Sequence, residues 1–364
     1  MSQTDPIHSA GEPLSGLPFR LGVFTRLVDE VPPAEVYARA LRLFETAEAL
    51  GFDTGWVAQH HARNSGGLPS PLVFLASAAA RTKHLRLATG IITLPLENPV
   101  RLAEDAAVLD ILSDGRLELG FGTGGAAAVF SIFGRDLDRR QADYVRAFAI
   151  VRDALAGKAL IPDGPVLFPP AARLVSRLWE ATFGVDGAIR AAEHGSGLLL
   201  ARTAVRPTPV DGAAVSADQP LGEVQAPLVD AYLAHWTSTA AAPRIGLSRS
   251  VYVAPTLADA EDGIRRHAKL VSNRAGFSGE RTVEELLSRA DVHAGSPDDV
   301  IASLRAEPLL SAATDLILQV HPVDPSPDKT LRSLELIATK VAPALGWRAR
   351  HHDSGRDLVT NTRG

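Results

Sequence analysis

Short apolar runs typical of β-strands alternate with helix-periodic stretches along this 364-residue chain. The predicted strands cover residues 20–25, 54–58, 85–93, 116–121, 174–179, 197–201, 249–254 and 315–320. Predicted helices lie at about 36–50, 71–81, 100–112, 138–155, 185–194, 225–236 and 331–344. Strands joined in order by right-handed helical crossovers form a parallel sheet that closes on itself. The pattern therefore predicts an α/β protein with a (β/α)8 TIM barrel.

Three longer segments interrupt the pattern, after predicted strands four, six and seven. They cover residues 157–170, 206–220 and 271–295, and each contains several prolines or glycines. A connection as long as 271–295 is uncommon unless it covers a site or is disordered. The polar ends, 1–18 and 348–364, are predicted to be flexible tails. One barrel domain over 19–347 remains.

Composition excludes several classes of protein. The net charge of −5 gives no basic face for nucleic acid, and no run approaches the roughly 20 apolar residues of a membrane span. The first residues lack the charged-then-apolar layout of a secretory signal, so we expect a cytoplasmic protein. The absence of cysteine excludes disulfides, thiolate metal ligands and a cysteine nucleophile. No metal site is predicted.

Reactive groups of a β/α barrel lie at the C-terminal ends of its strands. The second strand ends in Gln59-His60-His61, and a histidine that titrates near neutrality suits proton transfer. Adjacent residues of a strand point to opposite faces, so only one of the two histidines should face the barrel mouth. For the same reason they make a poor metal pair. A structural or hydrogen-bonding role for the histidine is the alternative.

Glycines mark the ends of the third and fourth strands. Gly90 lies inside the third, where a glycine often indicates a bulge or a closely approaching ligand, or simply tight packing. The fourth runs into Gly120-Phe-Gly-Thr-Gly-Gly125, which satisfies the G-x-G-x-x-G dinucleotide pattern. That pattern belongs after the first strand of a βαβ unit and before a long helix, which is not its place here. Gly122 and Thr123 are better read as a strand end that lets a flat ring or a phosphate approach.

The end of the fifth strand has the composition of a phosphate site. Small and hydroxyl residues precede a predicted helix, whose free N–H groups and dipole attract anions. We expect contacts from Thr182, Phe183, Gly184 and Gly187. Capping of the helix by Thr182 is the alternative. Arg140, with its neighbours Arg139 and Arg146, could clamp the same phosphate or belong to a solvated helix face.

These motifs join into a family resemblance. The run Phe52-Asp-Thr-Gly-Trp-Val-Ala-Gln-His-His61 resembles the strand-two segment of the bacterial-luciferase-like flavin monooxygenases, and so do Arg81–Pro95 and Asn98–Gly122 in their places. The resemblance is dense over 20–155 and returns at 179–203, 249–256 and 295–304. The runs Leu178–Gly187 and Leu198–Thr203 look like a subgroup of FMN-dependent members whose substrates are unassigned.

The resemblance implies a specific site. A flavin ring would lie across the barrel mouth near strands three and four, above a non-proline cis peptide between Gly90 and Ile91. His60 would take part in proton transfer. The phosphate would lie near Thr182–Gly187 with help from Arg140, and residues 271–295 would cover the site. Two departures are visible: Gln59 replaces a common glutamate, while Gly122 and Thr123 replace the cysteine and arginine of light-emitting members. Bioluminescence is not predicted.

The activity implied is oxygenation of a small organic substrate with O2 and reduced FMN. The FMN would come from an NAD(P)H-dependent flavin reductase, and the protein would form a homodimer. Two alternatives remain open at this point: an F420-dependent dehydrogenase on the same barrel, and a flavin-binding barrel without catalysis.

Overall fold

The computed structural model describes residues 19–27, 31–62, 67–203, 219–239, 241–261, 263–265, 287, 291–321 and 326–349. Eight parallel strands in these ranges form a closed ring: β1 Arg20–Thr25, β2 Thr54–Val57, β3 Arg86–Thr89, β5 Leu117–Gly122, β6 Leu178–Ala181, β7 Gly197–Leu200, β8 Ile245–Val253 and β10 Asp315–Gln319. The ring closes because β10 pairs with both β8 and β1. The predicted TIM barrel is confirmed.

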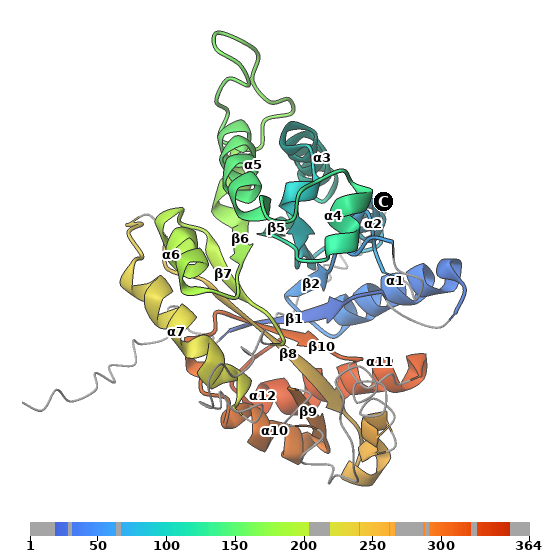
Figure 1. The fold of residues 1–364 in the computed structure, drawn as a ribbon. Helices are drawn as coiled ribbons and strands as arrows, with labels where there is room; N and C mark the ends of the chain where they lie inside the picture. The colour runs from blue at the N-terminus through green and yellow to red at the C-terminus, as the bar shows by residue number, and fades with distance from the viewer. Residues whose placement is uncertain are drawn as a thin grey trace, which may run out of the picture.

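Helices surround this ring on the outside (Figure 1). The longer ones are α1 Pro33–Ala49, α2 Pro71–Ala79, α3 Pro99–Leu112, α5 Arg140–Leu155, α6 Val185–Glu193, α7 Leu221–Ala234, α10 Pro297–Arg305 and α11 Pro327–Leu336. Short helices are α4 Ala127–Ile132 and α12 Ala342–Ala344, the latter after a π-helical turn at Ile337–Val341. Residues 257–261 and 263–265 are helical as well. Several begin on proline, whose missing N–H is no loss in the first turn.

The predicted third strand, 85–93, is divided in two, and one further short strand was not expected. β4 Ile92–Thr93 continues the line of β3 and pairs with β5, after an interruption at Gly90–Ile91. β9 Val292–Gly295 pairs with β8 on the outside of the ring, so the prediction of a loop through residue 295 is wrong at its end. Val292 and Ala294 bury their side chains against Tyr252, which fixes this strand. The rest of the predicted cover, 271–286 and 288–290, lies outside the described residues.

Other sequence boundaries also shift. The fifth strand was predicted at 174–179 but runs over Leu178–Ala181, because residues 172–177 form a 3₁₀ helix that buries Leu174. The seventh was predicted at 249–254 and starts earlier, at Ile245. Residues 157–170 contain no helix or strand and are mostly exposed, as expected of a surface insertion. The predicted tail 1–18, most of the loop 206–220 and residues 350–364 lie outside the described residues.

The inside of the ring is filled by large side chains below the level of the strand ends. Trp56 and Trp179 are fully buried and meet edge to face with ring centroids 5.6 Å apart. Phe24, Leu199 and Ile317 pack around them. This apolar layer closes the barrel interior and forms the floor of the space above it.

A charged layer closes the N-terminal end of the barrel. Glu118 accepts hydrogen bonds from Arg20 Nη1 and Trp179 Nε1, both at 2.7 Å. Burial raises the pKa of Glu118, but Arg20 and Arg86 outweigh this and hold the pKa well below its usual range. A cavity of about 500 Å³ borders this layer and is lined by Arg20, Arg86 and Glu118 among others. Enzymes of this fold carry their sites at the opposite end, where the strands have their C-termini.

Candidate active site

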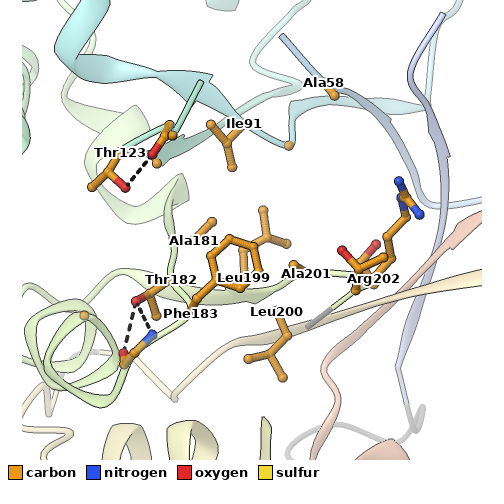
Figure 2. A pocket seen from close by; sticks show the side chains of 18 of the residues that line it. Ala58, Ile91, Thr123, Ala181, Thr182, Phe183, Leu199, Leu200, Ala201 and Arg202 are labelled. Carbon is orange, nitrogen blue, oxygen red and sulfur yellow. Dashed lines mark hydrogen bonds between the residues drawn. The ribbon is translucent and has the colours of Figure 1, made fainter. Parts of the chain in front are cut away.

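A cavity of about 1280 Å³ opens at the C-terminal ends of the strands. Figure 2 looks into it: Ile91 and Thr123 lie on one side, and Ala181, Leu199 and Leu200 lie across from them. The sequence-predicted site residues all line this cavity. They are His60, Gly90, Ile91, Gly122, Thr123, Arg140, Thr182, Phe183, Gly184 and Gly187.

The peptide bond between Gly90 and Ile91 is cis, as the resemblance implied. It separates β3 from β4 and is tied to the end of β2 by two hydrogen bonds. The Gly90 N–H donates to the Val57 carbonyl at 2.8 Å, and the Ile91 carbonyl accepts from the Gln59 N–H at 3.1 Å. The bond therefore lies beside the end of β2, on the wall of the cavity.

Two glycines at the end of β5 have close neighbours where a side chain would lie. A Cβ on Gly120 would lie 2.1 Å from the Thr89 carbonyl oxygen, and one on Gly122 would lie 3.0 Å from Ile91 Cδ1. Gly122 lines the cavity, and its missing side chain leaves room for Ile91. The approach of a ring or phosphate at Gly122 stays a prediction. In contrast, a Cβ on Gly125 would meet nothing within 4 Å.

Gln59 ties the cis segment to the end of β2. Its side chain is buried, and its Oε1 accepts from the Thr93 N–H at 2.7 Å. Its Nε2 donates to Glu97 Oε1 at 2.7 Å. A glutamate at position 59 would have no proton to donate to Glu97 when ionised. The departure at this position thus fits a neighbour that is itself acidic.

The two adjacent histidines face different ways, as expected of a strand end. His60 lines the cavity and lies with its Nε2 3.5 Å from Arg26 Nε. His61 does not line it; its ring packs edge-on against Phe133 at 4.7 Å between centroids. Burial lowers the pKa of His61, and the charge of Glu97 opposes this shift. Of the pair, only His60 can act on a molecule in the cavity.

The start of α6 forms the opposite end of the cavity from Arg202 (Figure 2). The Thr182 hydroxyl is bonded to the N–H and carbonyl of Gly184, at 3.1 and 3.0 Å. Gly184 is the N-cap, and no side chain caps the helix, so the alternative role of Thr182 as helix cap is not what the geometry shows. A Cβ on Gly187 would lie 2.1 Å from Thr182 Oγ1. The exposed N–H groups of a helix start thus face the cavity.

Sequence reasoning missed three cavity arginines: Arg26, Arg190 and Arg202. Arg190 lies in the last turn of α6, over the Tyr144 ring at 5.1 Å and with its Nε 3.5 Å from Glu180 Oε2. Arg140 donates to the Leu137 carbonyl at 3.0 Å. Arg26 follows β1 directly and Arg202 follows β7 by two residues. Their place at strand ends was a usable signal, because such positions face the site in this fold.

A match to a protein-family model identifies the family of this chain. The model described as luciferase-like monooxygenase matches residues 19–309. The chain belongs to the luciferase-like monooxygenase family. Among curated relatives, an uncharacterised protein of Sinorhizobium fredii is 36% identical over 191 residues, covering 50% of this chain and 56% of the relative. The chain thus matches only about half the length of that relative.

Two characterised members of the family are more distant or partial matches. Limonene 1,2-monooxygenase of Rhodococcus erythropolis is 27% identical over 83% of this chain and 80% of its own. The oxygenase component of flavin-dependent trigonelline monooxygenase from Acinetobacter baylyi is 36% identical over 27% of this chain and 28% of its own.

Solved structures share the barrel. Monooxygenase RslO1 of Streptomyces bottropensis has a TM-score of 0.71 at 25% identity, covering 90% of this chain and 100% of that one. The FMN complex of the oxygenating constituent of 3,6-diketocamphane monooxygenase from Pseudomonas putida has a TM-score of 0.70 at 17% identity, covering 90% and 98%. An F420-dependent secondary alcohol dehydrogenase has a TM-score of 0.62 at 17% identity, covering 90% and 99%.

Membrane-spanning helices and metal-ligand clusters are both absent from the described part of the chain. There, no helix combines the length and apolar character of a membrane span. Within the same ranges, no cluster of three His, Cys, Asp or Glu side chains has the arrangement of a metal site.

Proposed function

We propose that this protein is a flavin-dependent monooxygenase that uses reduced FMN and O2 to oxygenate a small organic substrate. The observation that carries the proposal is one cavity at the C-terminal strand ends that brings together His60, the cis peptide at Gly90–Ile91 and the start of α6. Membership of the family supports the reaction class.

The residues present fit an FMN molecule. Ligand pockets usually measure roughly 300–1,000 Å³, and this cavity, at about 1280 Å³, has room for a flavin and a second molecule. Apolar walls at Ile91, Ala181 and Leu199 suit a flat ring. The glycine at 184 has open space where a side chain would be, so the backbone there can meet a phosphate closely.

Each end of the cavity would then have a task. Thr182, Gly184 and Gly187 would hold the phosphate through hydroxyl and backbone groups, with the Arg140 guanidinium adding charge. Phe183 and Thr123 would border the ring and ribityl chain. When bound, reduced FMN supplies the electrons that activate O2. The chain contributes orientation, partial exclusion of water and a proton acceptor or donor at His60 Nε2.

A partner must supply the reduced flavin. The glycine run at 120–125 precedes α4, which spans only six residues, so it lacks the long helix of a dinucleotide site. An NAD(P)H-dependent flavin reductase acting in the cytoplasm would fill this need, and one relative is named as an oxygenase component. A homodimer packed through barrel helices is part of the same proposal.

F420 is the competing cofactor, since an F420-dependent dehydrogenase shares the fold. That enzyme class transfers hydride and consumes no oxygen. Anaerobic titration with reduced FMN, reduced riboflavin and reduced F420 separates the two. Tightest binding of reduced FMN, by at least tenfold, is expected. Tightest binding of F420 would replace the monooxygenase proposal with the dehydrogenase.

A reductase-coupled assay tests catalysis itself. With NADH, FMN, a flavin reductase and 18O2, a panel of small organic acids, aldehydes and terpenes should yield a product carrying one 18O atom. Binding of reduced FMN without labelled product across the panel would favour a flavin-binding barrel without catalysis.

A further inference from the structure

Arg202 lies at the end of the cavity away from Thr182 (Figure 2). It follows β7, is half-buried, and makes no hydrogen bond or ion pair with any part of the chain that the structure describes. An arginine offers five N–H donors in a rigid fork. A partly buried guanidinium whose donors meet no protein acceptor in these ranges is suited to a ligand that accepts hydrogen bonds.

A second arginine reaches the same end from the far side of the ring. Arg26 follows β1 and lines the cavity with Arg202. Burial, and after it the charge of Arg26, lower the pKa of Arg202 to about 10, while the charge of Asp291 opposes both. Two cations held near each other in a partly buried place repel, and an anion between them removes that repulsion.

The proton-transfer residue belongs to this end too. Arg26 Nε lies 3.5 Å from His60 Nε2. Between the arginines and the phosphate end the cavity is walled by Phe24, Trp56 and Ile317, and these side chains offer an apolar surface. A ligand matched to this half of the cavity therefore has an apolar body and one negatively charged end.

We propose that Arg202 and Arg26 bind the carboxylate of the substrate, so that the substrate is an apolar organic acid. This inference rests on the proposed function, since it assigns the other end of the cavity to FMN. The phosphate has a cation of its own at that end, Arg140, which leaves Arg202 to a different anion. The fork of Arg202 matches the two oxygens of a carboxylate.

Binding of octanoate and its neutral analogue octanamide tests the inference. Calorimetry on the full chain, with and without FMN, should give at least tenfold tighter binding of octanoate. The Arg202→Met variant should lose most of this preference and keep its affinity for octanamide. The matched control is Arg101→Met on α3, an exposed arginine paired with Asp105, which should leave the preference unchanged. Unchanged thermal melting would confirm that the variants are folded.

The possible failures are distinguishable. Equal affinity for octanoate and octanamide in the wild type would overturn the inference, whatever FMN does. A fall in the FMN-to-riboflavin affinity ratio in Arg202→Met, with octanoate binding intact, would assign the arginine to the cofactor and overturn it as well. Failure of the wild type to bind reduced FMN would instead contradict the proposed function, and the octanoate comparison would still be measurable.

Discussion

The side chains of Gln59 and Glu97 form one hydrogen bond, 2.7 Å from Nε2 to Oε1, beside the cis peptide. Gln59 also accepts from the Thr93 N–H. This pair fixes the end of β2 against β4 and thereby sets the height of His60 in the cavity. The amide of Gln59 thus supports this wall of the cavity with both its oxygen and its nitrogen.

Gln59→Glu should destabilise the fold by about 2 kcal/mol at pH 7.5, because two ionised carboxylates would face each other in a buried place. The loss should shrink at pH 5, where a shared proton can restore the hydrogen bond. Urea unfolding at both pH values measures it. The exchange Gln59→Glu with Glu97→Gln should recover most of the stability, since a donor is again present. Equal stability of Gln59→Glu and wild type would refute this account.

His60→Asn should lower product formation in the reductase-coupled assay by about 10²–10⁴-fold, the usual contribution of a general acid or base. Its affinity for reduced FMN should change little, because the phosphate end is untouched. His61→Asn is the matched control, since His61 lies outside the cavity and should keep near-normal turnover. Unchanged turnover in His60→Asn would remove that residue from the mechanism.

Gly187→Ala should weaken the binding of reduced FMN by about tenfold or more and leave the binding of riboflavin nearly unchanged. The added Cβ would lie 2.1 Å from Thr182 Oγ1 and push that hydroxyl out of place. Gly184→Ala would put a methyl group in the open space where we expect the phosphate, and should also weaken the binding of reduced FMN. Fluorescence titrations with both flavins give the ratio of FMN affinity to riboflavin affinity in each variant. A parallel loss of FMN and riboflavin would show that the start of α6 does not hold the phosphate.

Acid should destabilise the protein through His293 on β9. Burial and the charge of Arg249 lower the pKa of His293 to about 4, and Glu307 opposes this. The unfolded chain takes up a proton near pH 6.5 and the folded one does not, so stability is lost as the pH falls from about 6.5 to 4. His293→Asn should lose about 2 kcal/mol less than wild type between pH 7 and pH 4.5. Identical pH dependence in the two proteins would contradict the shift.

The sequence predicted the ring of strands because each buried run is punctuated by helix periodicity. It missed the start of β6, since the apolar residues Leu174 and Val175 read as strand although they lie in a 3₁₀ helix. β9 was missed for a similar reason: four residues against one neighbouring strand carry too little pattern to be seen in the sequence.

For the site, too, the sequence predicted residues at the ends of strands and helices, but not contacts between distant segments. His60 and Gly187 could be found because their strand or helix end is visible in the chain. The contact between Gly122 and Ile91 could not be predicted, since only the fold shows that Ile91 lies beside this glycine. Arg26 and Arg202 are 176 positions apart in number, and only their places directly after predicted strands indicate a common site. Closure of the barrel places them in one cavity.

The most direct test is a crystal structure of the protein with FMN bound. The account predicts the ring against Gly90–Ile91 within reach of His60, and the phosphate hydrogen-bonded at Thr182–Gly187. A phosphate held by Arg202, or a flavin bound anywhere other than the C-terminal mouth of the barrel, would contradict it.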